Sequence, residues 1–118
     1  MLDLHGFAAH EISDSRLRFF IINHRPPVDD ISGRAFPDAK AIGANSTIEI
    51  FELDRESSKL EFIRTIKDKS IIAPNNMAVS SQGRFIFTND HSSKSLFFLF
   101  FFLGFATCAT LSLKLRAN

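Results

Sequence analysis

The chain has 118 residues, enough for one small domain at most, because a domain takes about 150 residues on average. Fourteen Lys and Arg against 13 Asp and Glu leave a formal net charge of +1. That balance argues against a nucleic-acid binder, which normally carries a basic patch or stripe, so we expect no nucleic-acid partner. The single cysteine, Cys108, excludes an intramolecular disulfide and a multi-cysteine metal site.

The residue pattern divides the chain into three segments, residues 1–95, 96–113 and 114–118. The first segment mixes apolar and polar residues throughout, as a β-rich domain does. The second is strongly apolar, and six of the 14 Phe in the chain lie between Phe97 and Phe105. The third is a short polar tail. We therefore expect one partial β domain followed by a hydrophobic segment.

The first 24 residues predict a short extended piece, a turn and a strand. The pair Asp14-Ser15 is typical of a turn, and residues 17–22 are, apart from Arg18, apolar, aromatic or β-branched. That strand ends at the polar pair Asn23-His24. Residues 25–45 then carry Pro and Gly too often for a regular element, and we expect a loop there.

The second half of this segment predicts further strands. Residues 47–53 alternate apolar and polar side chains, with one doubled apolar step at Ile50-Phe51, and residues 60–66 are the returning strand of a hairpin. Two shorter runs lie at 77–79 and 84–88, with a turn between them. Several short strands at near-regular spacing favour a sandwich or a propeller.

Residues 96–113 carry no ionisable side chain except Cys108. A helix of this length covers about 27 Å, close to the ~30 Å hydrocarbon core of a bilayer. We therefore expect a single membrane-spanning helix and a membrane location for the chain. The alternative is an aggregation-prone apolar tail that never enters a membrane.

Polar residues stand at the ends of the predicted strands, where rigid scaffolds present functional groups. They are His5-Gly6, Asn23-His24, Asn75-Asn76 and Asn89-Asp90-His91. Amide, carboxylate and backbone oxygens suit a hard cation such as calcium, and histidine suits proton transfer near neutral pH. The alternative is that these side chains simply satisfy the backbone of turns.

Six short motifs follow one another in a fixed order: His5-Gly6-Phe7, residues 20–24, 46–51 and 60–67, the tetrapeptide Ala73-Pro74-Asn75-Asn76, and residues 83–91. Their order and spacing resemble the serum paraoxonase/arylesterase family over about residues 4–92. The resemblance implies a calcium-dependent six-bladed β-propeller, of which residues 1–95 would supply about one and a half blades. The expected fold class is therefore all-β, a propeller fragment followed by a hydrophobic C-terminal helix.

The resemblance also implies roles for individual residues. Asn75 is similar to a ligand of the catalytic calcium ion, and the Phe7 backbone carbonyl to a ligand of the structural one. Asn76 stands where animal members of the family have an aspartate ligand to that structural ion, so one negative charge is missing there. These positions imply Ca²⁺ as the cofactor.

Two histidines and an Asp-His pair complete the site that the resemblance implies. His5 corresponds to the general base that activates water, and His24 to the histidine that orients His5. Asp90 and His91 correspond to residues that line the site in a supporting role.

The implied activity is hydrolysis of a small aryl ester or lactone. Several of the family's calcium ligands have no counterpart here and its pattern breaks after Lys94, so we expect the chain by itself to be inactive. A second hypothesis is a non-catalytic, truncated membrane protein that pairs with a partner or with itself through open strand edges. A third is that the tail is translated non-coding sequence or a shifted reading frame.

Overall fold

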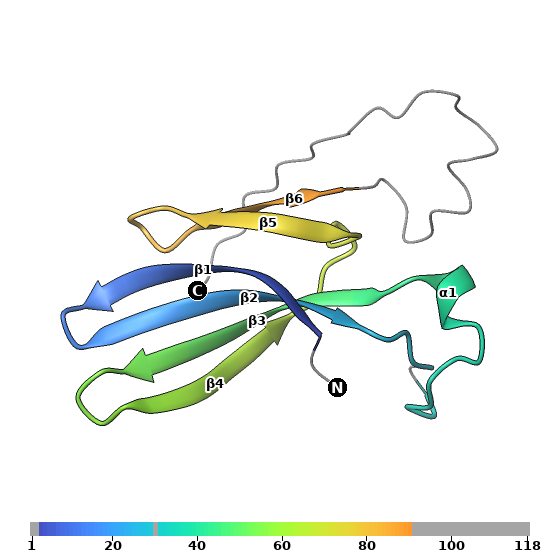
Figure 1. The fold of residues 1–118 in the computed structure, drawn as a ribbon, viewed down its shortest axis with the longest axis horizontal. Coiled ribbons are helices and arrows are strands. Elements are labelled where there is room, and N and C mark those ends of the chain that lie inside the picture. Colours follow the sequence, from blue (N-terminus) through green and yellow to red (C-terminus); the bar gives the residue numbers. More distant parts are fainter. Residues whose placement is uncertain (1–2, 30, 91–118) are drawn as a thin grey trace.

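The computed structural model describes residues 3–29 and 31–90, and these residues form two antiparallel sheets (Figure 1). The first sheet has the strand order β1-β2-β3-β4, and the second pairs β5 with β6. The bounds are β1 Leu4–Ser13, β2 Arg16–Arg25, β3 Asn45–Asp54, β4 Lys59–Ile66, β5 Pro74–Val79 and β6 Phe85–Asn89, with a short helix α1 at Ala39–Ile42. The all-β prediction for this part of the chain is confirmed.

The first sheet is two consecutive hairpins. The β1–β2 turn lies at Asp14-Ser15, as the sequence predicts, although β1 is a ten-residue strand rather than a short extended piece. In the second hairpin β4 contains one extra residue, because Ile50 pairs with Arg64 whereas Phe51 pairs with Phe62. This bulge lies beside the doubled apolar step of the sequence.

Residues 25–45 contain regular structure that the sequence analysis did not predict. The Asp38 side chain accepts a hydrogen bond from the Ala41 backbone N–H and so caps α1, which lasts a single turn before Gly43. Val28 and Ala35 also form an isolated bridge. The expectation of a loop without any regular element was therefore wrong for one turn of helix.

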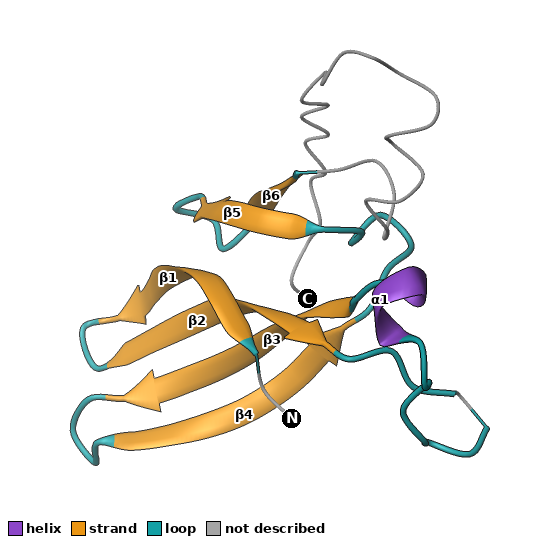
Figure 2. Ribbon diagram, turned by 45° about the vertical axis from the view of Figure 1, so that its right-hand side comes forward, coloured by secondary structure: helices purple, strands orange, loops and turns teal. Residues whose placement is uncertain are grey.

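The hydrophobic core lies between the two sheets. Alternate residues of β2 and β3 face the β5–β6 hairpin, which lies over one face of the first sheet in both views (Figures 1 and 2). The buried side chains are Phe20, Ile48, Ile50, Ile71, Phe85 and Phe87. Each contributes roughly 1.5–3 kcal/mol by leaving water, so this cluster is what holds the small sheet against the large one.

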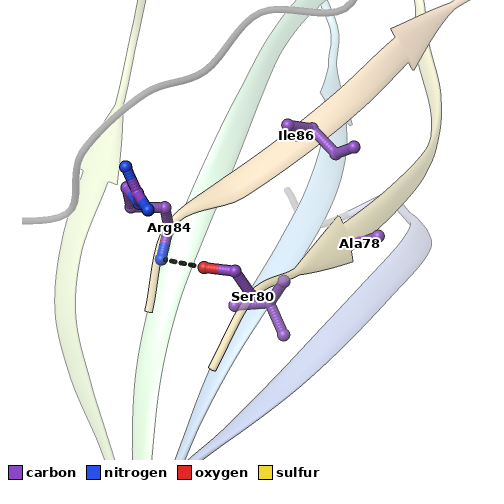
Figure 3. Close-up of a pocket in the computed structure, with 5 residues that line it drawn as sticks. Ala78, Ser80, Arg84 and Ile86 are labelled. Carbon is purple, nitrogen blue, oxygen red and sulfur yellow. Dashed lines mark hydrogen bonds between the residues drawn. The ribbon is translucent and has the colours of Figure 1, made fainter. Parts of the chain in front are cut away.

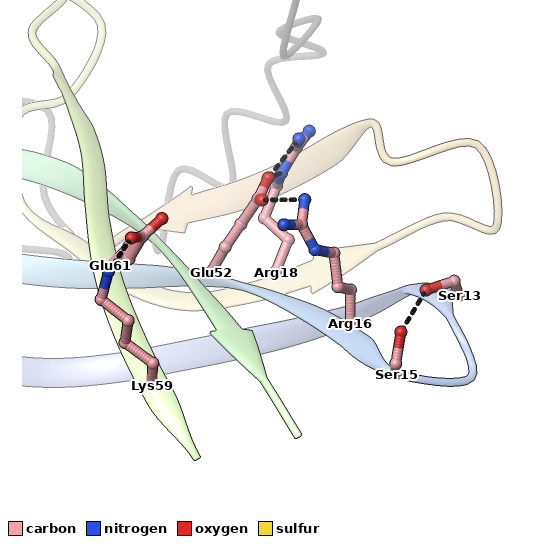
Figure 4. A network of polar contacts seen from close by, with 7 residues as sticks. All are labelled: Ser13, Ser15, Arg16, Arg18, Glu52, Lys59 and Glu61. Carbon is pink, nitrogen blue, oxygen red and sulfur yellow. Dashed lines mark hydrogen bonds and ion pairs between the residues drawn. The ribbon is translucent and has the colours of Figure 1, made fainter. Parts of the chain in front are cut away.

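The hairpin turns and the α1 loop lie at opposite ends of the sheets (Figure 2). Near the turns, Arg18 and Glu52 form an ion pair between β2 and β3 with a shortest N–O distance of 2.6 Å, and Lys59 pairs with Glu61 on β4 (Figure 4). Such surface pairs contribute at most about 1 kcal/mol each. The start of β1 and the end of β2 lie at the other end, near α1.

A carboxylate lies buried in the first sheet. Glu49 is 4% exposed and accepts hydrogen bonds from Asn23, Thr47 and Thr65. Burial by itself would raise the pKa of Glu49. The three hydrogen bonds and the charge of Arg25 outweigh burial and hold the pKa below its ordinary value.

The predicted membrane helix, Cys108 and His91 lie outside the described residues. Within residues 3–29 and 31–90, no helix is long and apolar enough to cross a bilayer.

The buried Glu49 carboxylate should make folding sensitive to acid. Because its pKa is lower in the folded chain than the ~4.3 of an unfolded glutamate, its contribution to stability is complete above that value. This contribution is lost as the pH falls through the folded pKa. We expect the free energy of unfolding, measured by denaturant titration at pH 6 and pH 3, to fall more in wild type than in Glu49→Gln. The control Glu56→Gln alters an exposed turn carboxylate, so its loss of stability between pH 6 and pH 3 should equal that of wild type. The same loss in all three chains would contradict the account.

Candidate active site

Two β-bulges face each other where the first sheet meets the second. In β1, Leu4 pairs with Asn23 and Phe7 with Ile21, so His5 and Gly6 together oppose one residue of β2. A bulge bends its strand and re-aims the side chains that it carries.

The second bulge lies in β5. Pro74 pairs with Asn89 and Met77 with Phe87, so Asn75 and Asn76 together oppose one residue of β6. Both sequence motifs therefore coincide with an irregularity in strand pairing.

Gly6 is what allows the two bulges to meet. A Cβ atom at this position would lie 2.5 Å from the Asn75 backbone oxygen and 3.3 Å from Cδ1 of Ile22. The first distance is too short for any side chain, so β1 can approach the β5 backbone here only with glycine.

A chain of polar contacts runs across this junction. His5 Nε2 lies 2.6 Å from Asn75 Oδ1, and Asn75 Nδ2 donates a 3.0 Å hydrogen bond to Asp90 Oδ1. The Asp90 carboxylate accepts, so the Asn75 amide must turn its oxygen toward His5. The proton of the shared His5–Asn75 contact therefore belongs to His5 Nε2, which leaves Nδ1 with the lone pair in the neutral ring.

His24 lies beside His5 but makes its hydrogen bond elsewhere. The two ring centroids are 5.3 Å apart with planes tilted by 59°, and His24 Nδ1 lies 3.0 Å from Ser46 Oγ. Burial is the largest influence on the pKa of His24 and lowers it, and the nearby His5 charge lowers it further. Asp3, Asp90 and the Pro74 carbonyl act in the opposite direction without reversing the shift.

The oxygen atoms at this junction fit part of a calcium site. Asn75 Oδ1 has a second lone pair beyond the one His5 uses, and the Asp90 carboxylate is largely exposed; both are hard donors of the kind calcium prefers. Two side chains are fewer than the six to eight oxygens calcium takes. Across the described part of the chain, no three His, Cys, Asp or Glu side chains cluster as metal ligands.

The two residues expected at a structural calcium ion lie at the same junction. Phe7 is the first residue after the β1 bulge, and its ring is 67% exposed. Asn76 is the second bulge residue of β5; its backbone N–H contacts Thr88 Oγ1 at 3.4 Å and its side chain is exposed.

Two further residues support the site. Ser46 is buried and contacts His24, a role that the sequence did not predict for the first residue of the motif 46–51. Asn89, one of the polar residues at the predicted strand ends, is 4% exposed; its Oδ1 accepts from the backbone N–H groups of Ile72 and Ala73, and its Nδ2 donates to the Ser70 carbonyl. This clamp fixes the loop that leads into β5.

Two other features lie away from the junction. His10, which lies in none of the six motifs, packs its ring 3.3 Å from the position of a Cβ at Gly83 in the β5–β6 turn. A shallow hollow of about 290 Å³ lies near the same turn, lined by Ala78, Val79, Ser80, Arg84 and Ile86 (Figure 3). Its lining is mostly apolar and includes neither histidine of the junction.

Replacing Gly6 by alanine should separate the two bulges. The added methyl group would force β1 away from β5, with an expected loss of about 1–3 kcal/mol in the free energy of unfolding and a shift of the His5 ring signals in NMR spectra. Gly33→Ala is the control, because Gly33 has φ +67° but open space around it. It should lose comparable stability through backbone strain while leaving the His5 signals in place. Unchanged His5 signals in Gly6→Ala would contradict the close approach.

The comparison with known families bears on this junction. A search of curated proteins gives no match. The family model for Arylesterase matches residues 40–110, more than half of the chain. The matched range includes Asn75, Asn76 and Asp90 but begins after both junction histidines.

The matched range ends at residue 110, inside the apolar segment 96–113. With the motif order and the antiparallel sheets, the family match leads to one conclusion: this chain belongs to the Arylesterase family.

Proposed function

We propose that the junction of β1 and β5 is one wall of a calcium-dependent site that hydrolyses aryl esters or lactones. The observation that carries the proposal is the 2.6 Å contact between His5 Nε2 and Asn75 Oδ1, which joins the expected base to the expected metal ligand. His24 lies beside this pair, and Asp90 supports it from the end of β6.

His5 acts as the general base in this proposal. Its Nε2 proton is held by Asn75, so the Nδ1 lone pair is free to accept a proton from water. The resulting hydroxide adds to the ester carbonyl carbon, the bond to the alcohol or phenol oxygen breaks, and that oxygen takes up the proton. The products are a carboxylic acid and an alcohol or phenol, or a hydroxy acid from a lactone.

His24 serves as a neutral neighbour. Its lowered pKa keeps the ring uncharged near neutral pH, so it does not oppose the positive charge that His5 gains with the proton. Ser46 holds its orientation.

Asn75 would supply a ligand to the catalytic calcium, with Asp90 supporting it through the Asn75 amide, and the Phe7 carbonyl and Asn76 would contribute to the structural ion. Bound calcium would polarise the carbonyl oxygen of the substrate. The remaining oxygens must come from elsewhere, and for that reason the described residues are not expected to catalyse turnover alone.

The strand order supports a propeller fragment as the underlying fold. Four antiparallel strands in consecutive order, β1-β2-β3-β4, have the make-up of one propeller blade, and β5–β6 supplies the first half of the next. The β5–β6 hairpin packs face to face on the first sheet, as neighbouring blades do.

A second candidate function is self-association or partner binding at a membrane surface. The observation that favours it is β4, the last strand of the first sheet as far as the structure describes the chain, where Leu60, Phe62 and Ile63 are 57%, 57% and 44% exposed. Edge strands with apolar side chains pair readily with another chain. In this candidate residues 96–113 anchor the chain in the membrane.

Calcium should bind weakly at the junction. In a titration of the full chain, we expect the Asn75 side-chain amide signal to shift with a dissociation constant in the millimolar range, because few ligands are present. Asn75→Ala should abolish the response of the neighbouring Asp90, and the control Asp54→Asn, at the distant end of β3, should leave the titration unchanged. Calcium shifts that survive in Asn75→Ala, or that are absent from the junction, would contradict the site.

Phenyl acetate or lactone turnover that a chelator removes, that is lost in His5→Gln and kept in His10→Gln, would support the hydrolytic site. Both candidates expect the chain alone to be inactive, so carbonate-resistant membrane association is the result that would support the second candidate.

A further inference from the structure

The buried Glu49 cluster extends to the start of β1. Asn23 is 1% exposed, and its Nδ2 donates a 3.0 Å hydrogen bond to Glu49 Oε1. Its Oδ1 accepts a 2.9 Å hydrogen bond from the Asp3 backbone N–H. One amide therefore connects a buried carboxylate on β3 to the residue that precedes β1.

Asp3 is held from both sides by neighbouring residues of β2. Its N–H goes to the Asn23 side chain, and its carbonyl accepts a 2.8 Å hydrogen bond from the His24 backbone N–H. The β1 bulge starts directly after Leu4. The clamp on Asp3 therefore fixes the chain on the near side of the bulge that carries His5.

This clamp matters because a bulge leaves part of the strand unpaired. The residues within the bulge take their positions from the paired residues on either side. On the far side the ladder resumes at Phe7 with Ile21, and on the near side Leu4 pairs with Asn23 and Asp3, one residue earlier, supplies a further anchor. A shift at Asp3 would therefore move the His5 ring relative to Asn75.

Glu49 determines which way the Asn23 amide points. The carboxylate only accepts hydrogen bonds, so Asn23 must turn its NH₂ group toward Glu49 and its oxygen toward Asp3. The reversed amide would place an oxygen against the carboxylate and an NH₂ group against the Asp3 N–H. Thr47 and Thr65 donate to the same carboxylate and keep it in place.

We propose that Glu49 is a positioning residue for the junction: through Asn23 and Asp3 it sets the place of His5 opposite Asn75. It touches neither histidine and acts through the Asn23 amide. Its importance for catalysis rests on the proposed hydrolytic function, but the positioning itself is a property of the fold.

An exchange of donor and acceptor tests this proposal. Asn23→Asp keeps an oxygen for the Asp3 N–H but places a second carboxylate against Glu49. Adding Glu49→Gln returns a donor to the pair, because the new amide on β3 can donate to the new carboxylate on β2. We expect Asn23→Asp to lower the hydrogen-exchange protection of the His24 amide about tenfold or more and to shift the His5 ring signals. The double variant should recover most of the His24 protection and return the His5 ring signals most of the way to their wild-type positions.

The measurements use the full chain in mild detergent, with the Ile50 amide of β3 as an internal reference. Glu49→Met, which removes the acceptor but keeps a side chain of similar size, should lower His24 protection relative to Ile50. Glu49→Gln alone should stay near wild type, because its carbonyl oxygen still accepts from Asn23. Glu52→Gln is the matched control, since Glu52 joins the same two strands through Arg18 at the turn end (Figure 4). It should leave the His24 and His5 signals unchanged.

Three results would overturn the proposal. The first is a parallel loss of His24 and Ile50 amide protection in the Glu49 and Asn23 variants. The second is unchanged His24 protection and unchanged His5 ring signals in Asn23→Asp. The third is a double variant whose His24 protection is as low as that of Asn23→Asp. None of these readouts needs calcium or turnover, so a failed hydrolysis assay would not affect them.

Discussion

The close approach of β1 to the β5 backbone at Gly6 is the constraint on which this molecule depends. It brings a bulge of the first sheet against a bulge of the second, and the His5–Asn75 contact spans the gap. The core between the sheets supplies the energy that holds them together, but the contacts of the buried Phe and Ile side chains are non-directional. The glycine and the two bulges are what turn packed sheets into an oriented polar junction.

Around that junction, hydrogen bonds to backbone do most of the positioning. Asn89 holds the loop before β5, and Asn23 holds the residue before β1. Both are buried amides at a strand end, and each satisfies donors and acceptors at once. Since an unsatisfied buried polar group costs about 1–3 kcal/mol, these side chains define one arrangement of the loops rather than many. The histidines then need few contacts of their own.

Much of the β-structure could be predicted from the sequence because side-chain alternation is local. The β3–β4 hairpin and the turn before β6 lie where the pattern places them. Helix α1 was missed because its signal is a single Asp38 cap within a segment rich in Pro and Gly. The bulges could not be predicted, because the pairing register depends on both strands and cannot be deduced from the sequence of one strand. The doubled apolar step at Ile50-Phe51 is an exception, since it lies beside a bulge of β4.

For the junction of β1 and β5, the order of the motifs indicated which residues are present but not which of them contact one another. The family resemblance paired His5 with His24, and the two rings do lie 5.3 Å apart, but the hydrogen bond of His5 is with Asn75 and that of His24 is with Ser46. Glu49 looked like an ordinary polar position of an alternating strand, and only its burial reveals the cluster. Polar residues inside a strand that is covered on both faces are therefore the signal to look for in such sequences.

The most direct test of the account is the tautomer of His5. A long-range ¹H–¹⁵N spectrum of the histidine rings, recorded at alkaline pH where imidazole is neutral, distinguishes a proton on Nε2 from one on Nδ1. The account predicts that neutral His5 carries its proton on Nε2, because Asn75 Oδ1 can only accept. A proton on Nδ1, or rapid averaging between the two tautomers, would contradict the junction of β1 and β5 described above.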